Sequence, residues 1–423
     1  MPTGRRSILM LTPDQGFLDR RITQEARTLA GRGWSVDIFP THLPLDPPAE
    51  MLAPDVRMVP RPSQPRASRA RRFKHLLRDV APRLHRMADG AQSLVTDRAG
   101  QIAAWNLDYL LGRGPYAAVF AHDIPVLPLA VRLKSVWGCA VICDLHEIYP
   151  DMVTGASSAL TRRYWRRVES RFLPQADGIL CVNAAVEEYV RGLYAPSTPI
   201  AVVHNSVPYT ADPRVPGCDI RGLYGLSDAR RVLAFAGTLG ADTNIETLVA
   251  GFGRAHIEGW ILALLGSGPL EERLGTIVSE DRLADRVFLG RPVPQQDWVP
   301  MLSSAHAGAL PYRAIDRNHL ISTPNKLFEY AQARLPIAAS RLPMIERIIT
   351  ANGNGAFVDY ANPATTAEGL RRFIASDLAG FSRDALEIAA RNLSWERDEE
   401  AFLSVVSQAL DDASGHVRGR LAV

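Results

Sequence analysis

Short apolar segments that alternate with helix-forming segments are the feature that most constrains the fold of this chain. Several of the apolar segments end in glycine, histidine or aspartate, and a stretch with helical periodicity follows. This interval is typical of parallel β–α–β units, whose strands all end at one edge of their sheet. Because 423 residues exceed what one hydrophobic core usually accommodates, the sequence predicts an α/β fold with two domains.

The expected strands form two groups separated by a linker. Residues 208–217 contain several prolines and a glycine, which favours an interdomain connection. We therefore place one domain at residues 1–207 and the other at residues 218–394. The predicted strands are 7–12, 35–39, 117–121, 140–143, 178–182, 200–203, 232–236, 260–265, 287–289, 307–310 and 337–339.

Composition excludes several classes of protein. Hydrophobic residues make up 47% of the chain and charged residues 22%, which is typical of a globular enzyme and not of a disordered chain. A net charge of +3 gives no general argument for polyanion binding. No apolar run approaches the ~18 residues of a membrane-spanning helix, and the cysteines lack metal-ligand spacing. These observations predict a cytoplasmic protein.

Residues 322–339 combine a loop, a helix start and a buried strand. Thr323 suits the N-cap of this helix, with Pro324 at its first position. Lys326 then falls in the first turn, where a cation is unfavourable unless an anion such as a diphosphate lies in front of the helix. Glu329 shares that helix face and could accept hydrogen bonds from a ribose diol. A solvated Lys–Glu ion pair is the alternative.

Glycines follow the strands of the second half. They allow the phosphates and base of a ligand to approach the backbone closely, although each glycine turn alone is weak evidence. With Thr-Pro-Asn-Lys at the same sheet edge, a nucleotide site is the better interpretation. The candidate residues outside that stretch are Gly237, Thr238, Gly266, Gly268 and Arg291.

Polar, titratable residues end two strands of the first half. His122 and Asp123 follow one strand, and Asp144-Leu145-His146-Glu147 ends the other. Open α/β sheets place their chemistry at this edge, so we expect a site here, with His146 the stronger catalytic candidate. Gly16, in the first strand–helix loop, either lets a substrate approach the backbone or only makes the turn. No Gly-x-Gly-x-x-Gly is present, which argues against a dinucleotide cofactor.

Two stretches, 61–86 and 162–171, are rich in arginine and interleaved with apolar residues. Such elements suit an anionic membrane surface at the inner face of the membrane. Two solvated helix faces are the equal alternative, and nucleic acid is disfavoured because no recognised binding motif accompanies the charge.

The ordered set of strand-end motifs resembles that of the GT-B glycosyltransferases, in particular their retaining family four (glycosyl transferases group 1). The resemblance implies two Rossmann-like domains facing each other across a cleft, with the last helix, 395–412, crossing back to the N-terminal domain. The motifs are His122-Asp123, Asp144-Leu145-His146-Glu147, Gly237-Thr238-Leu239-Gly240, Leu265-Gly266-Ser267-Gly268-Pro269 and Pro324-Asn325-Lys326-Leu327-Phe328-Glu329-Tyr330.

The resemblance also implies an activity: transfer of a sugar from a UDP- or GDP-linked donor to an acceptor hydroxyl, with no metal and no further cofactor. Glu329 would hold the donor ribose, Lys326 would lie near the diphosphate, and His146 beside the transferred sugar. The acceptor, which is unidentified and is lipid-linked in one interpretation, would bind the N-terminal domain. The implied sites are catalytic His146, Lys326 and Glu329; donor-binding Gly16, Gly237, Thr238, Gly266, Gly268, Arg291, Thr323, Pro324 and Asn325; and acceptor-side His122, Asp123 and Glu147.

This sequence departs from the family pattern at two places. Many relatives have a second glutamate eight positions before the ribose-binding one, where this chain has Ile321, and cations where it has residues 241–244. Leaving-group charge would then fall to Lys326 and the helix start, with Arg313 or Arg317 as further candidates. A sugar-nucleotide epimerase and a catalytically idle nucleotide-sugar-binding homologue are therefore alternative functions.

Overall fold

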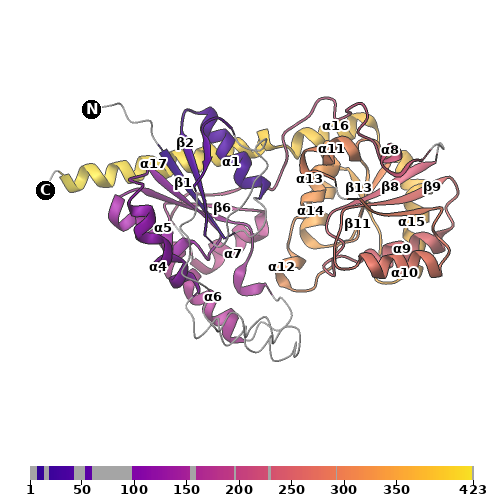
Figure 1. Ribbon diagram of the computed structural model, residues 1–423, viewed down its shortest axis with the longest axis horizontal. Coiled ribbons are helices and arrows are strands. Elements are labelled where there is room, and N and C mark those ends of the chain that lie inside the picture. The colour runs from indigo at the N-terminus through magenta and orange to yellow at the C-terminus, as the bar shows by residue number, and fades with distance from the viewer. Residues whose placement is uncertain are drawn as a thin grey trace. The chain divides into compact units, whose positions relative to one another are not determined.

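The computed structural model describes residues 7–13, 19–41, 53–59, 98–152, 159–194, 197–226, 230–291 and 293–421. The chain forms two compact units (Figure 1). The first unit comprises the residues up to His204 together with those from Asp398 onward, and the second comprises Asn205–Arg397. Each unit is built around one parallel sheet with helices on its faces, as the alternation of segments predicts. Among the described residues, no helix is both long and apolar enough to cross a membrane.

The first unit holds a sheet in the order β3-β2-β1-β4-β5-β6-β7, in which neighbouring strands are parallel. Its strands are β1 (Ser7–Thr12), β2 (Ser35–Pro40), β3 (Val56–Met58), β4 (Ala118–His122), β5 (Ala140–Leu145), β6 (Gly178–Cys181) and β7 (Ile200–Val202). Its helices are α1 (Arg20–Gly31), α4 (Arg98–Leu111), α5 (Leu127–Trp137), α6 (Ala159–Phe172) and α7 (Ala184–Tyr194). The strands at the centre of the sheet are buried along their whole length, because helices cover both faces of a parallel sheet.

The second unit holds a parallel sheet in the order β10-β9-β8-β11-β12-β13. Its strands are β8 (Arg231–Ala236), β9 (Trp260–Leu265), β10 (Val287–Arg291), β11 (Ala307–Leu310), β12 (Ile337–Ala339) and β13 (Gly355–Phe357). Its helices are α8 (Ile220–Tyr224), α9 (Ile245–Ala255), α10 (Glu271–Glu280), α11 (Trp298–Leu302), α12 (Arg317–Leu320), α13 (Asn325–Gln332), α14 (Pro343–Asn352), α15 (Pro363–Arg372) and α16 (Arg383–Asn392). In both sheets the strand order reverses beside the strand that comes first in the sequence, which is β1 in one sheet and β8 in the other. Ligands of such sheets bind next to this reversal, at the carboxyl ends of the strands.

The last helix, α17 (Trp395–Leu421), returns the chain to the first unit and runs further than predicted. The ring of Phe402 lies 6.0 Å from that of Phe120 on β4. Val405 packs against Gly178, where a Cβ atom would come within 2.8 Å of the valine side chain. Thr28 on α1 donates a hydrogen bond of 2.9 Å to Glu399. The predicted crossing of the C-terminal helix to the N-terminal domain is therefore confirmed.

Candidate functional site

In the second unit, the loops after β8 and β9 lie directly against each other. The Gly237 amide donates to the Leu265 carbonyl at 2.9 Å. A Cβ atom on Gly266 would collide with the carbonyl oxygen of Gly237. Both glycines also have positive φ angles, +133° and +127°, which side-chain-bearing residues rarely adopt. Glycine is thus required at both strand ends for backbone contact.

A second set of contacts continues this pairing of the two loops. Leu239 donates to the Ser267 carbonyl at 3.0 Å and accepts a bond of 3.0 Å from the Leu270 amide. A Cβ atom on Gly268 would lie 2.6 Å from the Leu239 carbonyl oxygen. Thr238, between these contacts, is exposed. The paired loops form a rigid backbone surface at the sheet edge, with Thr238 on its open side.

Lys326 extends from the first turn of α13 onto this surface. Its Nζ lies 5.3 Å from the ring centroid of Phe235 and 5.9 Å from that of Tyr312. A Cβ atom on Gly237 would come within 2.5 Å of Nζ. Burial lowers the pKa of Lys326, although the charges of Glu329 and Asp242 partly oppose this shift. The ammonium group is therefore held in a partly desolvated place beside the Gly237 loop.

The start of α13 differs by one residue from the prediction. Pro324, not Thr323, is the N-cap, with extended backbone angles (φ −59°, ψ 139°) and no capping side-chain hydrogen bond. Thr323 is buried before the helix begins, so it does not occupy the capping position. The N-cap side chain therefore contributes no bond to the first turn of α13, in which the Leu327 amide donates to the Pro324 carbonyl at 3.0 Å. The start of a helix favours a bound anion.

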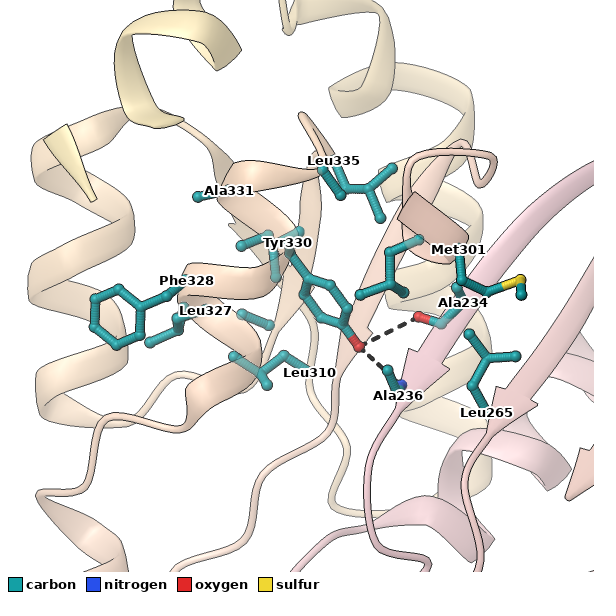
Figure 2. Packing of buried hydrophobic residues seen from close by; sticks show 14 of the residues in the cluster. Ala234, Ala236, Leu265, Met301, Leu310, Leu327, Phe328, Tyr330, Ala331 and Leu335 are labelled. Carbon is teal, nitrogen blue, oxygen red and sulfur yellow. Dashed lines mark hydrogen bonds between the residues drawn. The ribbon is translucent and has the colours of Figure 1, made fainter. Parts of the chain in front are cut away.

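Buried side chains on α13 fix its position against the sheet. The Tyr330 hydroxyl accepts a bond of 3.2 Å from the Ala236 amide and donates one of 3.0 Å to the Ala309 carbonyl. Figure 2 shows this phenol among apolar side chains, with its oxygen between Ala234 and Ala236 of β8. Glu329 is only 4% exposed, which excludes the alternative of a solvated Lys–Glu pair.

The remaining candidate residues are placed less fully. Asn325 is exposed, and its side-chain oxygen accepts a bond of 3.1 Å from Asn205. Arg291 is the last residue of β10, and only its backbone is described. Gly16 and the stretch 61–86 lie outside the described residues. Arg313 is exposed beside the 241–244 loop, where its amide donates to the Asp242 carbonyl at 3.1 Å.

In the first unit, one buried carboxylate collects three cationic or titratable groups. Asp144, at the end of β5, forms an ion pair with Arg21 of α1. Its second oxygen accepts bonds from His122 Nδ1 at 3.0 Å and from His146 Nε2 at 2.8 Å. Burial alone would raise the pKa of Asp144, but Arg21 and the two histidines lower it well below its usual value.

Asp123 holds the loop that bears His146. It has a positive φ of 69°, and its Oδ1 accepts bonds from the His146 amide at 2.9 Å and the Glu147 amide at 3.3 Å. Burial raises the pKa of Asp123 to about 7, with the charge of His146 opposing the rise. The structure thus brings four predicted residues together at the carboxyl ends of β4 and β5. They are His122, Asp123, His146 and Glu147.

The two histidines have opposite electrostatic environments. Burial would lower the pKa of His146, but Asp144 and Asp123 raise it well above its usual value. Its other nitrogen, Nδ1, lies 3.6 Å from Asp19. Burial lowers the pKa of His122, whose Nε2 is buried without a hydrogen-bond partner among the described residues. In this arrangement His146 is an imidazolium that donates from Nε2 to Asp144 and faces Asp19 with Nδ1, and His122 is a neutral ring.

Sequence reasoning missed Asp19 and Arg21, which complete this cluster. Asp19 is the N-cap of α1 and accepts a bond of 2.8 Å from the Arg21 amide. Its position directly before a helix was the available signal. Arg21 is 1% exposed, and nothing in the sequence around it predicts that this arginine is buried.

The same cluster contains three potential metal ligands. Ligand atoms of His122, Asp144 and His146 lie within 4.8 Å of one another. Asp144 already pairs with Arg21, and the raised pKa of His146 favours a proton over a metal on its ring. The arrangement therefore suits a proton-bearing, cationic histidine better than a metal centre.

Comparisons with known proteins give the family. A model described as "Glycosyl transferase 4-like domain" matches residues 18–206, and one described as "Glycosyl transferases group 1" matches residues 230–376. Together they account for most of the chain. No curated protein matches it.

Solved structures share the fold at low sequence identity. A glycosyltransferase from Rickettsia africae is similar with a TM-score of 0.63 and 12% identity, covering 96% of this chain and 99% of its own. Anabaena HepE in complex with UDP is similar with a TM-score of 0.61 and 12% identity, covering 95% of this chain and 99% of its own. The lipopolysaccharide outer core galactosyltransferase WaaB is similar with a TM-score of 0.58 and 14% identity, and the match also covers 95% of this chain and 99% of its own. The chain is a glycosyltransferase of the group 1 family, and its two Rossmann-like units have the architecture of the GT-B fold.

Proposed function

We propose that this protein transfers a sugar from a UDP- or GDP-linked donor to an acceptor hydroxyl, with retention of anomeric configuration, in polysaccharide, glycolipid or other glycoconjugate biosynthesis. The observation that carries the proposal is Lys326, whose ammonium lies beside the Gly237 loop at the uncapped start of α13. A cation, backbone amides and a helix N-terminus together suit a diphosphate. Solved structures of Anabaena HepE contain UDP and UDP-glucose, which supports this donor class.

In the proposed reaction, the chain lowers the barrier by stabilising the departing nucleoside diphosphate. Lys326 and the amides after Pro324 take up the charge that develops on the diphosphate oxygen, with no metal ion required. Glu329, buried on the same helix, accepts hydrogen bonds from the ribose diol. Gly237, Thr238, Gly266, Gly268 and Arg291 complete the donor site.

His146 is the proposed catalytic group of the first unit. As an imidazolium it keeps Nε2 on Asp144 and offers Nδ1–H, which lies 3.6 Å from Asp19, to a sugar oxygen; a ring that carries both protons does not act as a general base. His122 and Asp123 position it through Asp144 and through its own backbone amide. Glu147 remains a proposed acceptor-side residue.

The test is the substitution Lys326→Ala, with UDP and GDP binding measured by calorimetry and donor turnover by product release. We expect turnover to fall at least ~10²-fold, as for loss of one charge-stabilising donor in an active site. Lys134→Ala is the matched control, because Lys134 pairs with Asp177 in the first unit. Unchanged turnover in the Lys326 variant would reject the role of Lys326.

A catalytically idle nucleotide-sugar-binding homologue is the second candidate. Ile321 stands where many relatives have a glutamate, and residues 241–244 carry no cation. Such a protein binds nucleotide but shows no turnover with any donor. An epimerase, in contrast, releases an epimerised nucleotide-sugar without an acceptor. Turnover without an acceptor therefore identifies an epimerase, turnover only with one identifies a transferase, and binding without turnover in either case identifies the idle homologue.

The place of action is proposed as the cytoplasm, at the inner face of the membrane. Of the two basic stretches, residues 162–171 lie on α6, where Arg162, Arg163, Arg167 and Arg171 are exposed. Their charge supports contact with an anionic surface.

A further inference from the structure

A cavity of about 630 Å³ opens among helices α4, α5 and α6 of the first unit. It lies on the helical layer, not at the strand ends that carry His122 and His146. Four arginines line it: Arg132 from α5, and Arg163, Arg167 and Arg171 from α6. Tyr164 and Phe172 supply aromatic walls. The catalytic proposal uses none of these residues.

The four guanidinium groups are not neutralised by the protein. Within the described residues, none of them forms an ion pair or a side-chain hydrogen bond, and no carboxylate lines the cavity. Arg166, on the same helix, differs because it lies 3.8 Å from the carboxylate of Asp151. The cavity therefore concentrates positive charge that has no internal counter-charge.

The spacing on α6 brings these charges together on one side of the helix. Arg163, Arg167 and Arg171 are four residues apart, and like charges at that spacing destabilise a helix. Arg132 adds a fourth charge from the neighbouring helix. A bound anion would remove this repulsion, and guanidinium groups match the oxygens of phosphate bidentately.

The remaining walls indicate what the phosphate is attached to. Tyr164 is held in place by the Ala99 amide, which donates to its hydroxyl at 2.9 Å. The Arg171 guanidinium lies 5.2 Å from the ring centroid of Phe172, and Val168 is largely buried beneath. These groups offer apolar contact beside the charged rim. We propose that this cavity binds a phosphate-bearing organic anion, either a phospholipid headgroup or a soluble phosphate ester.

The test uses full-length protein and two probes. Binding of inorganic pyrophosphate is measured by calorimetry, and binding to phosphatidylcholine vesicles, with or without phosphatidylglycerol, by co-sedimentation. The variant is Arg167→Gln and its matched control is Arg162→Gln, an exposed arginine of the same helix that does not line the cavity. Each removes one charge. Both are also made in a Lys326→Ala background, which removes diphosphate binding at the proposed donor site.

We expect Arg167→Gln to weaken binding at least ~10-fold, as for loss of one charge-assisted hydrogen bond. Arg162→Gln should match the parent protein with pyrophosphate and lose clearly less than Arg167→Gln with phosphatidylglycerol vesicles, where it removes only one surface charge. Loss in the pyrophosphate titration identifies a soluble ligand. Loss only with phosphatidylglycerol vesicles identifies a lipid headgroup. Equal binding by both variants, or binding of neither probe by the parent protein, overturns the proposal without affecting the proposed sugar transfer.

Discussion

At the scale of single residues, Asp144 binds two histidines whose pKa values move in opposite directions. His122 is enclosed, so desolvation dominates and its pKa falls. His146 is also desolvated, but it faces Asp144 and Asp123, and its pKa rises well above the usual range. Two rings that contact one carboxylate oxygen therefore carry different charges near neutral pH.

Nitrogen-15 NMR of the imidazole rings tests this difference. We expect His146 to remain an imidazolium and His122 to remain neutral, with its proton on Nδ1, throughout the range near pH 7. Asp144→Asn should lower the pKa of His146, because its nearest counter-charge is removed. Matching titration curves for the two rings would contradict the assignment.

The raised pKa of His146 also determines how its contribution to the stability of the first unit changes with pH. A folded-state pKa above the unfolded value of about 6.5 gives stability that is fully present below that value and is lost as pH rises through the folded pKa. His146→Gln should therefore lower the melting temperature of the first unit most at mildly acidic pH. The deficit should shrink only in alkaline solution, as differential scanning calorimetry across pH would show.

Gly266 and Gly275 offer a matched pair for the paired-loop geometry. Gly266→Ala places a methyl group against the Gly237 carbonyl at positive φ, and should destabilise the second unit by at least about 2 kcal/mol. Gly275 lies in α10 with no atom within 4 Å of its Cβ position. Alanine there should stabilise the unit by about 0.5–1 kcal/mol. Thermal unfolding distinguishes the two, and equal effects would show that the loop contact is not rigid.

At the scale of elements, α13 is positioned by a phenol and not by its N-cap. Burial raises the pKa of Tyr330, so its hydroxyl stays protonated and can donate to the Ala309 carbonyl while accepting from the Ala236 amide. These bonds connect α13 to β11 and β8 together. The placement of Lys326 against Gly237 depends on that connection.

Tyr330→Phe should cost about 1–3 kcal/mol of stability, since buried backbone groups lose their partner. It should also weaken nucleotide binding, because α13 shifts. Tyr360→Phe is the control: Tyr360 donates a buried bond of 2.8 Å to the Ala338 carbonyl, away from α13. Calorimetry should find similar stability losses and weaker UDP or GDP binding only in the Tyr330 variant. Equal nucleotide affinity in the two variants would show that the position of α13 does not determine nucleotide binding.

The elements also show what sequence could and could not predict. Apolar runs such as Trp260–Leu265 and Ser7–Thr12 were predicted with their observed bounds. The edge strands β3 and β13 were missed, because three residues that include an arginine or a glycine give no apolar run. The strand-end residues His122 and His146 were predicted to meet, whereas Arg21 was not, since its burial depends on contacts with distant Asp144 and Val203.

At the scale of the whole molecule, the first unit is not continuous in sequence. It needs α17, which supplies Phe402, Val405 and Ala409 to its core. Phe402→Ala should destabilise the first unit by about 3–5 kcal/mol, through lost burial and the cavity left behind. The second unit should be unaffected, because Phe402 belongs to the first.

Scanning calorimetry with and without nucleotide separates the two transitions. A nucleotide that binds the second unit raises the unfolding temperature of that unit alone by mass action, which identifies the transition of the second unit. The Phe402 variant should then shift the other one. A parallel shift of both transitions would show that the units unfold together.

The distant origin of α17 has a consequence for biosynthesis. The chain emerges from its N-terminus, so Phe120 leaves the ribosome about 280 residues before Phe402, which covers it, and Gly178 about 230 residues before Val405. At roughly 5–20 residues per second, the delay is on the order of 10–60 s. The second unit, drawn from one uninterrupted stretch, can complete its core during that interval. The unit made first is therefore completed last, and its sheet presents an uncovered apolar face to the cell until α17 has been made.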